Sequence, residues 1–151
     1  LSDYPVASST EEHDNVAQTG TEKYAKSGLR KELAEEYLTK LLKYMGEEKP
    51  YIDGDLTIHH LSQKTGIPRH YITEVLNEKH GRNFFTFVNE YRVREVISRI
   101  NDPRYHHYTI LAIAFDSGFN SKSTFNSIFK AYTGKTPSEY RNELTKPTEK
   151  V

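Results

Sequence analysis

The apolar residues between positions 83 and 101 change sides halfway along the stretch. At about 100° per residue, the first apolar set falls on one side of a helix and consists of Phe84, Phe87, Val88 and Tyr91. The second set falls on roughly the opposite side and consists of Val93, Val96, Ile97 and Ile100. The change of side predicts a linker helix over residues 84–101 whose two halves pack into different hydrophobic units. Asn83 is a suitable N-cap, and Asp102 before Pro103 marks the end.

A second helical pattern precedes the linker helix. Its apolar positions recur at helical spacing and are Leu29, Leu33, Tyr37, Leu38, Leu41, Leu42 and Met45. Ser27 is a candidate N-cap, and we predict that the helix ends before Gly46 and Pro50. We interpret this segment as a core-facing helix, and a helix that binds a partner is the alternative. Residues 1–28 have little apolar periodicity, so we predict a disordered linker there and a frayed tail at 146–151.

The chain repeats itself on either side of the linker helix. The segment LTIHHLSQKTGI aligns with YTILAIAFDSGF at an offset of 52, and after one inserted residue the offset becomes 53. The paired positions are Thr57 with Thr109, Ile58 with Ile110, Leu61 with Ile113, Gly66 with Gly118, Ile67 with Phe119, Ile72 with Phe125, Leu76 with Phe129, Gly81 with Gly134 and Phe87 with Tyr140. We therefore predict two copies of one unit, over about residues 29–82 and 102–145.

Each copy has the spacing of a helix-turn-helix unit. A threonine caps a short first helix, a small residue follows, and a glycine four positions later allows a left-handed turn. A second amphipathic helix comes next, over Pro68 to Lys79 in the first copy and Ser121 to Thr133 in the second. A final short helix starts after Thr136, with Pro137 at its first position and Glu139 at its third.

Composition limits the classes of function. The 151 residues include no cysteine, which excludes disulfides and thiolate chemistry, and no apolar run approaches the 18 residues of a membrane span. The formal net charge is zero, with seven Lys or Arg against ten Asp or Glu in residues 1–50 and twelve against ten in residues 51–144. Any contact with nucleic acid must therefore come from local placement of charge.

Signals for catalysis are weak. The adjacent pairs His59-His60 and His106-His107 diverge by about 100° on a helix, which is poor geometry for a shared metal. The sequence has no glycine-rich phosphate loop, nucleophile elbow or Cys/His pattern. We expect no enzyme activity, no metal and no cofactor.

A known family has closely similar motifs. The signature of the AraC/XylS class of bacterial transcription regulators closely resembles GFNSKSTFNSIFKAYTGKTPSEYR, and the first half of its DNA-binding domain resembles TIHHLSQKTGIPRHYITEVLNEKHG with FVNEYRVREVISRI. The similarity covers about residues 32 to 144. It implies an all-α, homeodomain-like fold over 29–145, with about seven helices in two helix-turn-helix subdomains joined by the linker helix. The two recognition helices are expected to enter successive major grooves of DNA.

The resemblance also implies which side chains read bases. On the first recognition helix the matching positions are Arg69, His70, Thr73 and Glu74, and on the second they are Lys122, Ser123, Asn126 and Ser127. Arginine bonds guanine, glutamate accepts from cytosine and asparagine pairs with adenine. Glu74 departs from the family, where that position is often basic, and the second helix lacks the arginine that relatives often have. A solvated helix face is the alternative for Arg69, His70, Ser123 and Ser127.

Phosphate contacts are expected from two helix N-termini and three cations, namely Thr57, Thr109, Lys79, Arg82 and Lys130.

Two further arginines have an open role, because Arg92 and Arg141 either brace the fold or touch DNA. An interaction module that kept the double helix-turn-helix but lost DNA binding is the alternative function.

Further partners follow from the resemblance. The segment EKYAKSGL resembles the lead-in of a subgroup whose upstream halves are sensory and often membrane-embedded. Because the chain begins at Leu1 rather than Met, we expect a C-terminal fragment that lacks an upstream sensory domain. We expect this fragment to be cytoplasmic, and in that subgroup the whole regulator is membrane-anchored. The expected partners are double-stranded DNA and RNA polymerase.

Overall fold

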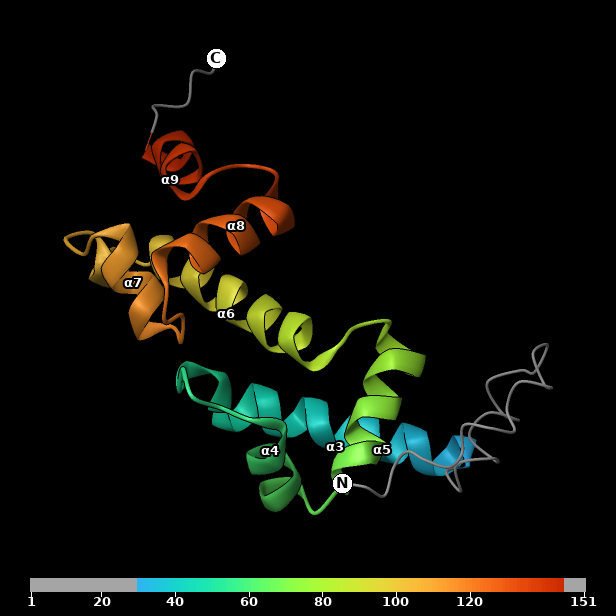
Figure 1. The fold of residues 1–151 in the computed structure, drawn as a ribbon. Helices are drawn as coiled ribbons and strands as arrows, with labels where there is room; N and C mark the ends of the chain where they lie inside the picture. Colours follow the sequence, from blue (N-terminus) through green and yellow to red (C-terminus); the bar gives the residue numbers. More distant parts are fainter. Residues whose placement is uncertain (1–29, 146–151) are drawn as a thin grey trace. The chain divides into compact units, whose positions relative to one another are not determined.

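A computed structural model describes residues 30–145 of the chain. Within that range it contains seven α-helices and no strand (Figure 1). The α-helices are α3 (Lys31–Glu48), α4 (Ile58–Thr65), α5 (Arg69–Val75), α6 (Phe84–Ile100), α7 (Ile110–Asp116), α8 (Lys122–Thr133) and α9 (Pro137–Thr145). Three short helices, η2 (Pro50–Ile52), η3 (Leu76–His80) and η4 (Pro103–Tyr105), lie between them. The predicted all-α fold is confirmed. The predicted linker at 1–28, the Ser27 cap and the tail at 146–151 lie outside the described residues.

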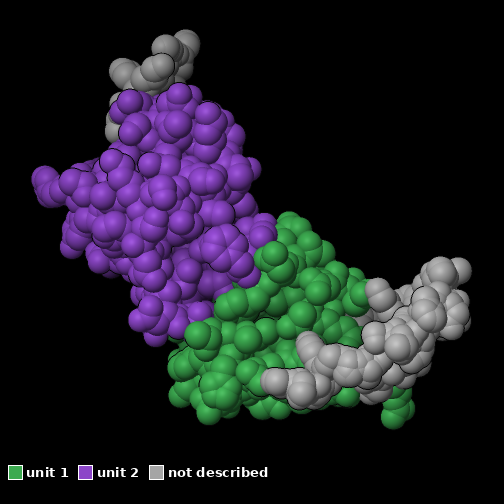
Figure 2. Space-filling view, viewed as in Figure 1, with its two compact units in different colours: residues 1–48, 57–84 green, residues 49–56, 85–151 purple. Residues whose placement is uncertain are grey.

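Contacts divide the chain into two compact units (Figure 2). The first contains described residues up to 48 together with 57–84, and the second contains 49–56 and the described residues from 85 onward. The segment 49–56 therefore belongs to the second unit although it precedes α4 in sequence. The helix predicted over 84–101 is α6, which ends at Ile100. The prediction that its two halves pack into different units stays a prediction.

The first unit consists of α3, α4, α5 and η3. The prediction that the first of these helices ends before Gly46 is wrong, because α3 continues through Gly46 to Glu48. In one buried cluster, Ala34 of α3 packs with Val75 of α5, and partly buried Leu33, Tyr37, Leu38 and Tyr71 surround them. The Thr57 side chain caps α4 by accepting a hydrogen bond from His60 N at 3.1 Å. The helix ends at Gly66, whose φ of 79° is left-handed, as the sequence predicted.

The second helix of the first unit differs from its prediction. Instead of one helix from Pro68 to Lys79, an α-helix over Arg69–Val75 is followed by a π-helical turn over Leu76–His80. Pro68 is the capping residue, with extended ψ of 141°, rather than the first helical residue. The wide turn closes at Gly81, with φ of 66°, and Arg82 N donates to Leu76 O at 3.1 Å. Hydrophobic periodicity does not distinguish an α-turn from a π-turn, because both bury Leu76.

The second unit has its own core between α6, α7 and α8. Its buried members are Val93, Val96, Ile100, Ile113, Ala114, Phe119, Phe125 and Phe129. Phe129 meets Tyr140 of α9 edge to face, with ring centroids 5.5 Å apart. The predicted capping box of α9 is confirmed, because Glu139 N donates to Thr136 Oγ1 at 3.1 Å and Thr136 N donates to Glu139 Oε1 at 3.0 Å.

Repeat-related positions are buried alike in the two units. Leu61, Ile67, Ile72 and Leu76 in the first unit, and Ile113, Phe119, Phe125 and Phe129 in the second, are each no more than 2% exposed. The second unit has the larger side chains at three of these positions. It has phenylalanine where the first unit has Ile67, Ile72 and Leu76. The duplication in sequence is therefore a duplication of core positions.

Candidate nucleic-acid interface

The turn of the first helix-turn-helix unit is fixed by short polar contacts. Ser62 Oγ donates to Ile67 O at 2.6 Å, and Thr65 Oγ1 donates to Leu61 O at 2.7 Å. Gly66 N donates to Ser62 O at 2.8 Å, which closes the C-terminus of α4. Ile67 then enters the core, being 1% exposed. These contacts set the direction in which α5 leaves the turn.

The side chains predicted to read bases lie on the outer side of α5. Arg69, His70 and Thr73 are exposed and Glu74 is half-buried. The opposite side, Ile72 and Val75, is buried in the unit. The structure thus gathers all four predicted residues within the first two turns of one helix.

The second unit repeats this arrangement on α8. The Ser121 side chain caps the helix by accepting from Thr124 N at 3.2 Å, and Ser117 Oγ donates to Ile113 O at 2.7 Å in the turn before it. The four predicted side chains are all exposed, and they are Lys122, Ser123, Asn126 and Ser127. The buried side of the helix is formed by Phe125 and Phe129.

The residues predicted to contact phosphate differ in the hydrogen bonds and ion pairs that they already form within the protein. Thr57 and Thr109 are exposed and use their hydroxyl oxygens as helix caps, Thr109 accepting from Ala112 N at 3.0 Å. Lys79 Nζ pairs with Glu35 at 3.2 Å, which partly neutralises it. Arg82 Nη1 donates to His80 O at 3.4 Å, and Lys130 is exposed near the end of α8.

Arg92 braces the second unit. It is 9% exposed, and its guanidinium donates to Tyr51 O at 2.7 Å, Asp53 O at 2.9 Å and Asn89 Oδ1 at 3.1 Å. Burial lowers the pKa of Arg92 below its ordinary value, and the Asp53 carboxylate opposes this shift. Of the two roles left open by the sequence, the contacts support the bracing one.

Arg141 braces the segment in front of α7. Its Nη1 donates to Tyr108 O at 2.8 Å, and its Nη2 donates to Tyr105 O at 3.3 Å. These carbonyls come just before Thr109, the cap of α7. Arg92 and Arg141 thus each bind backbone carbonyls a few residues ahead of a first helix.

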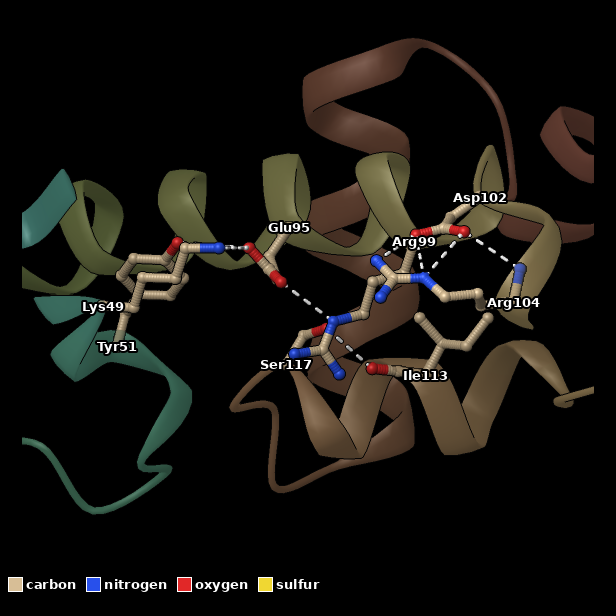
Figure 3. A network of polar contacts seen from close by, with 8 residues as sticks. All are labelled: Lys49, Tyr51, Glu95, Arg99, Asp102, Arg104, Ile113 and Ser117. Carbon is tan, nitrogen blue, oxygen red and sulfur yellow. Dashed lines mark hydrogen bonds and ion pairs between the residues drawn. The ribbon is translucent and has the colours of Figure 1, made fainter. Parts of the chain in front are cut away.

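A polar network on α6 was not found from the sequence (Figure 3). Glu95 accepts from Arg99 Nε at 2.9 Å, from Lys49 Nζ at 3.3 Å and from the Tyr51 hydroxyl at 3.3 Å. Burial acts to raise the pKa of the Glu95 carboxyl, but the contacts with Arg99 and Lys49 outweigh it and lower the pKa. Burial and the Glu95 carboxylate raise the pKa of Tyr51 to about 12. Only the Glu95–Arg99 pair, four residues apart on one helix, had a signal in the sequence.

The described residues contain no group of three or more His, Cys, Asp or Glu side chains placed to hold a metal ion. The same part of the chain has no helix that is long and apolar enough to cross a bilayer.

Two short helices joined by a tight turn occur twice in this all-α chain, and each pair exposes the N-terminal turns of its second helix. This fold defines a tandem helix-turn-helix protein. A family model described as a helix-turn-helix domain matches residues 61–143, which is more than half of the chain. The chain belongs to this helix-turn-helix family and is of the AraC type.

Similar proteins agree with this assignment. An uncharacterized HTH-type transcriptional regulator of Staphylococcus aureus (strain COL) is 32% identical over 95 residues, which cover 63% of this chain and 12% of that protein. The probable transcription factor PqrA of Proteus vulgaris is 25% identical over 115 residues, which cover 76% of this chain and 91% of that protein. The matched residues therefore span only 12% of the length of the S. aureus regulator.

A solved structure supports the fold. The C-terminal domain of AraT, a response regulator from Geobacillus stearothermophilus, superposes with a TM-score of 0.56 at 18% identity. The superposition covers 76% of this chain and 90% of that chain.

Proposed function

We propose that this chain is the sequence-specific DNA-binding part of an AraC-type transcription regulator, and that α5 and α8 each read one major groove. The observation that carries the proposal is the repeated exposure of the first turns of the second helix opposite a buried apolar side. A major groove admits an α-helix, and in helix-turn-helix units the N-terminal residues of the second helix contact base edges. The family assignment supports the same activity.

On α5, Arg69 is proposed as the main base contact. A guanidinium can donate to guanine O6 and N7 at once, and Arg69 is exposed at the first helical position. His70 and Thr73 are proposed as neighbouring contacts. Glu74 can accept a hydrogen bond from the amino group of cytosine. Because its carboxylate repels phosphate, this contact requires that no DNA phosphate lies close to Glu74.

On α8, the proposed readout uses smaller groups. Asn126 can pair with adenine N6 and N7, and Lys122 can donate to guanine or to phosphate. Ser123 and Ser127 complete the exposed face. Because this face has no arginine, we propose that water-mediated contacts and DNA shape supply part of its specificity.

Phosphate contacts are proposed at Thr57, Thr109, Lys79, Arg82 and Lys130. Among the three cations Lys130 is the strongest candidate, since Lys79 is paired with Glu35 and Arg82 donates to His80 O. RNA polymerase and an upstream sensory domain are proposed as further partners of the whole regulator.

A salt titration tests the proposal against an interaction module that does not bind DNA. Binding of the chain to a mixed-sequence duplex is measured by fluorescence anisotropy from low to high salt. Each phosphate contact is expected to contribute about −0.9 to the slope of log K against log salt, so several contacts give a steep decline. Absence of binding at low salt would favour the interaction module.

A further inference from the structure

The segment 49–56 is held in the second unit by a buried guanidinium. The Arg92 side chain binds the carbonyl oxygens of Tyr51 and Asp53 at 2.7 and 2.9 Å. The Tyr51 ring, which is buried, stacks on Tyr91 of α6 with centroids 5.3 Å apart. Backbone carbonyls are costly to bury without a donor, so these contacts fix the path of the segment.

The same segment lies directly against the turn between α7 and α8. A Cβ atom at Gly118 would come closer than 3.0 Å to both Tyr51 O and Arg92 Nε. Gly118 therefore needs to be glycine for two reasons, since its φ of 113° is also left-handed. One residue beyond Phe119, Asn120 Nδ2 donates to Gly54 O at 3.0 Å.

Gly54 is matched to Asn120 in shape. A Cβ at Gly54 would overlap the amide group of Asn120, closer than 3.0 Å to its oxygen, nitrogen and carbon. A side chain at position 54 therefore forces the exposed amide group of Asn120 to turn away and breaks its hydrogen bond to Gly54 O. Asn120 immediately precedes Ser121, the N-cap of α8, so its hydrogen bond to Gly54 O ties the residue before that cap to segment 49–56.

We propose that Gly54 and Asn120, backed by Arg92, are positioning residues that set the orientation of the first turn of α8 and thereby the base preference of the second helix-turn-helix unit. This inference rests on the proposed DNA-binding function and goes beyond it. It assigns control of α8 to a residue that precedes the first helix-turn-helix unit in sequence. Neither residue belongs to the set predicted to touch bases.

The test measures discrimination at each half of the DNA site separately. The probe is a duplex selected from random DNA by the wild-type chain, with two derivatives in which one half-motif each is scrambled. Discrimination is the ratio of the affinities for the intact and the scrambled probe. In Gly54→Ala, this ratio for the α8 half-motif should fall about three- to tenfold, which corresponds to the loss of about one hydrogen bond. The affinity lost on scrambling the α5 half-motif should stay unchanged.

Two further variants separate positioning from general damage. Asn120→Ala removes the hydrogen bond to Gly54 O, so it should itself reduce discrimination at the α8 half-motif. Adding Asn120→Ala to Gly54→Ala also removes the overlap, so the double variant should match Asn120→Ala alone and lose no more. Gly46→Ala is the matched control, because a Cβ there meets nothing within 4 Å and should change neither half. Because Asn120 is exposed, Asn120→Ala should fold, and it tests the proposal by itself if Gly54→Ala fails to fold.

Each outcome decides the inference. Equal loss of discrimination at both half-motifs, or no change at either, would overturn it while the DNA-binding function stands. Absence of any preferred sequence for the wild-type chain would overturn both the function and the inference.

Discussion

Arg69 is the single side chain on which the specificity of the first unit is expected to depend most. Replacing it by alanine should cost about 1–3 kcal/mol on the preferred site and relax the preference at one base pair. Lys130→Ala is the control, since it should weaken all sequences alike and reduce the salt slope by about one. Competition binding against single-base variants of the site measures both effects. If Arg69→Ala lowers affinity equally for every sequence, Arg69 is a phosphate contact only.

Glu95 gives the second unit a dependence on pH. The pKa of its carboxyl is lowered in the folded chain from the ordinary 4.5. A lowered folded-state pKa means that the contribution to stability is present above the unfolded-state pKa and is lost as pH falls through the folded-state pKa. Glu95→Gln should therefore reduce the free energy of unfolding by about 1 kcal/mol at pH 7. The difference should vanish in acid.

Urea unfolding of wild type and Glu95→Gln at a series of pH values measures this effect. A difference that is the same at pH 7 and in acid would show that the carboxylate charge contributes nothing, and that only the shape of the side chain matters.

Residue-scale features were predictable where both partners are close in sequence. Thr57, Thr109 and the Thr136–Glu139 box were found because a cap bonds a group three positions away. The contacts of Arg92 with Tyr51 and of Asn120 with Gly54 span 41 and 66 residues. No local rule pairs residues at such distances, so the bracing of segment 49–56 could not be derived from the sequence.

At the scale of elements, the turn before α8 is tightly constrained at Gly118. Gly118→Val adds a branched side chain at a left-handed φ and against a backbone oxygen, so it should destabilise the second unit by at least about 2 kcal/mol. Gly134→Ala is the matched control: its φ of 84° is also left-handed, but nothing lies within 4 Å of a Cβ there. It should cost only about 1 kcal/mol.

Hydrogen exchange resolved by helix checks this prediction. In Gly118→Val the amides of α7 and α8 should lose protection before those of α4 and α5. Simultaneous and equal loss in all four helices would contradict a unit-specific effect.

Periodicity and capping residues predicted the buried faces of the helices but not every detail of their ends, and the count of about seven helices came from the family resemblance. The predicted linker helix over 84–101 corresponds to α6, Phe84–Ile100, because Asp102-Pro103 is a strong local stop. The π-helical turn at Leu76–His80 was missed, since its apolar residue is buried in either geometry. The outer faces of α5 and α8 followed from the position of their buried residues. Their roles toward bases stay predictions.

For the whole molecule, the unexpected feature is the assignment of residues 49–56. The only regular element there is the three-residue helix η2, which is too short for a periodic signal. Contacts place this segment with α6, α7, α8 and α9, although the repeat in sequence predicted a first unit over about residues 29–82. A zero net charge also gave no global indication of a nucleic-acid partner. The repeated helix-turn-helix spacing and the family resemblance supplied it instead.

The proposed function requires that one chain carry two reading helices for one DNA site. Selection of bound duplexes from random DNA by the 151-residue chain, followed by sequencing, tests it most directly. We expect two distinct half-motifs whose centres lie about 10 bp apart, the spacing of successive major grooves on one face of the duplex. Enrichment of a single short motif, or of no motif, would contradict it.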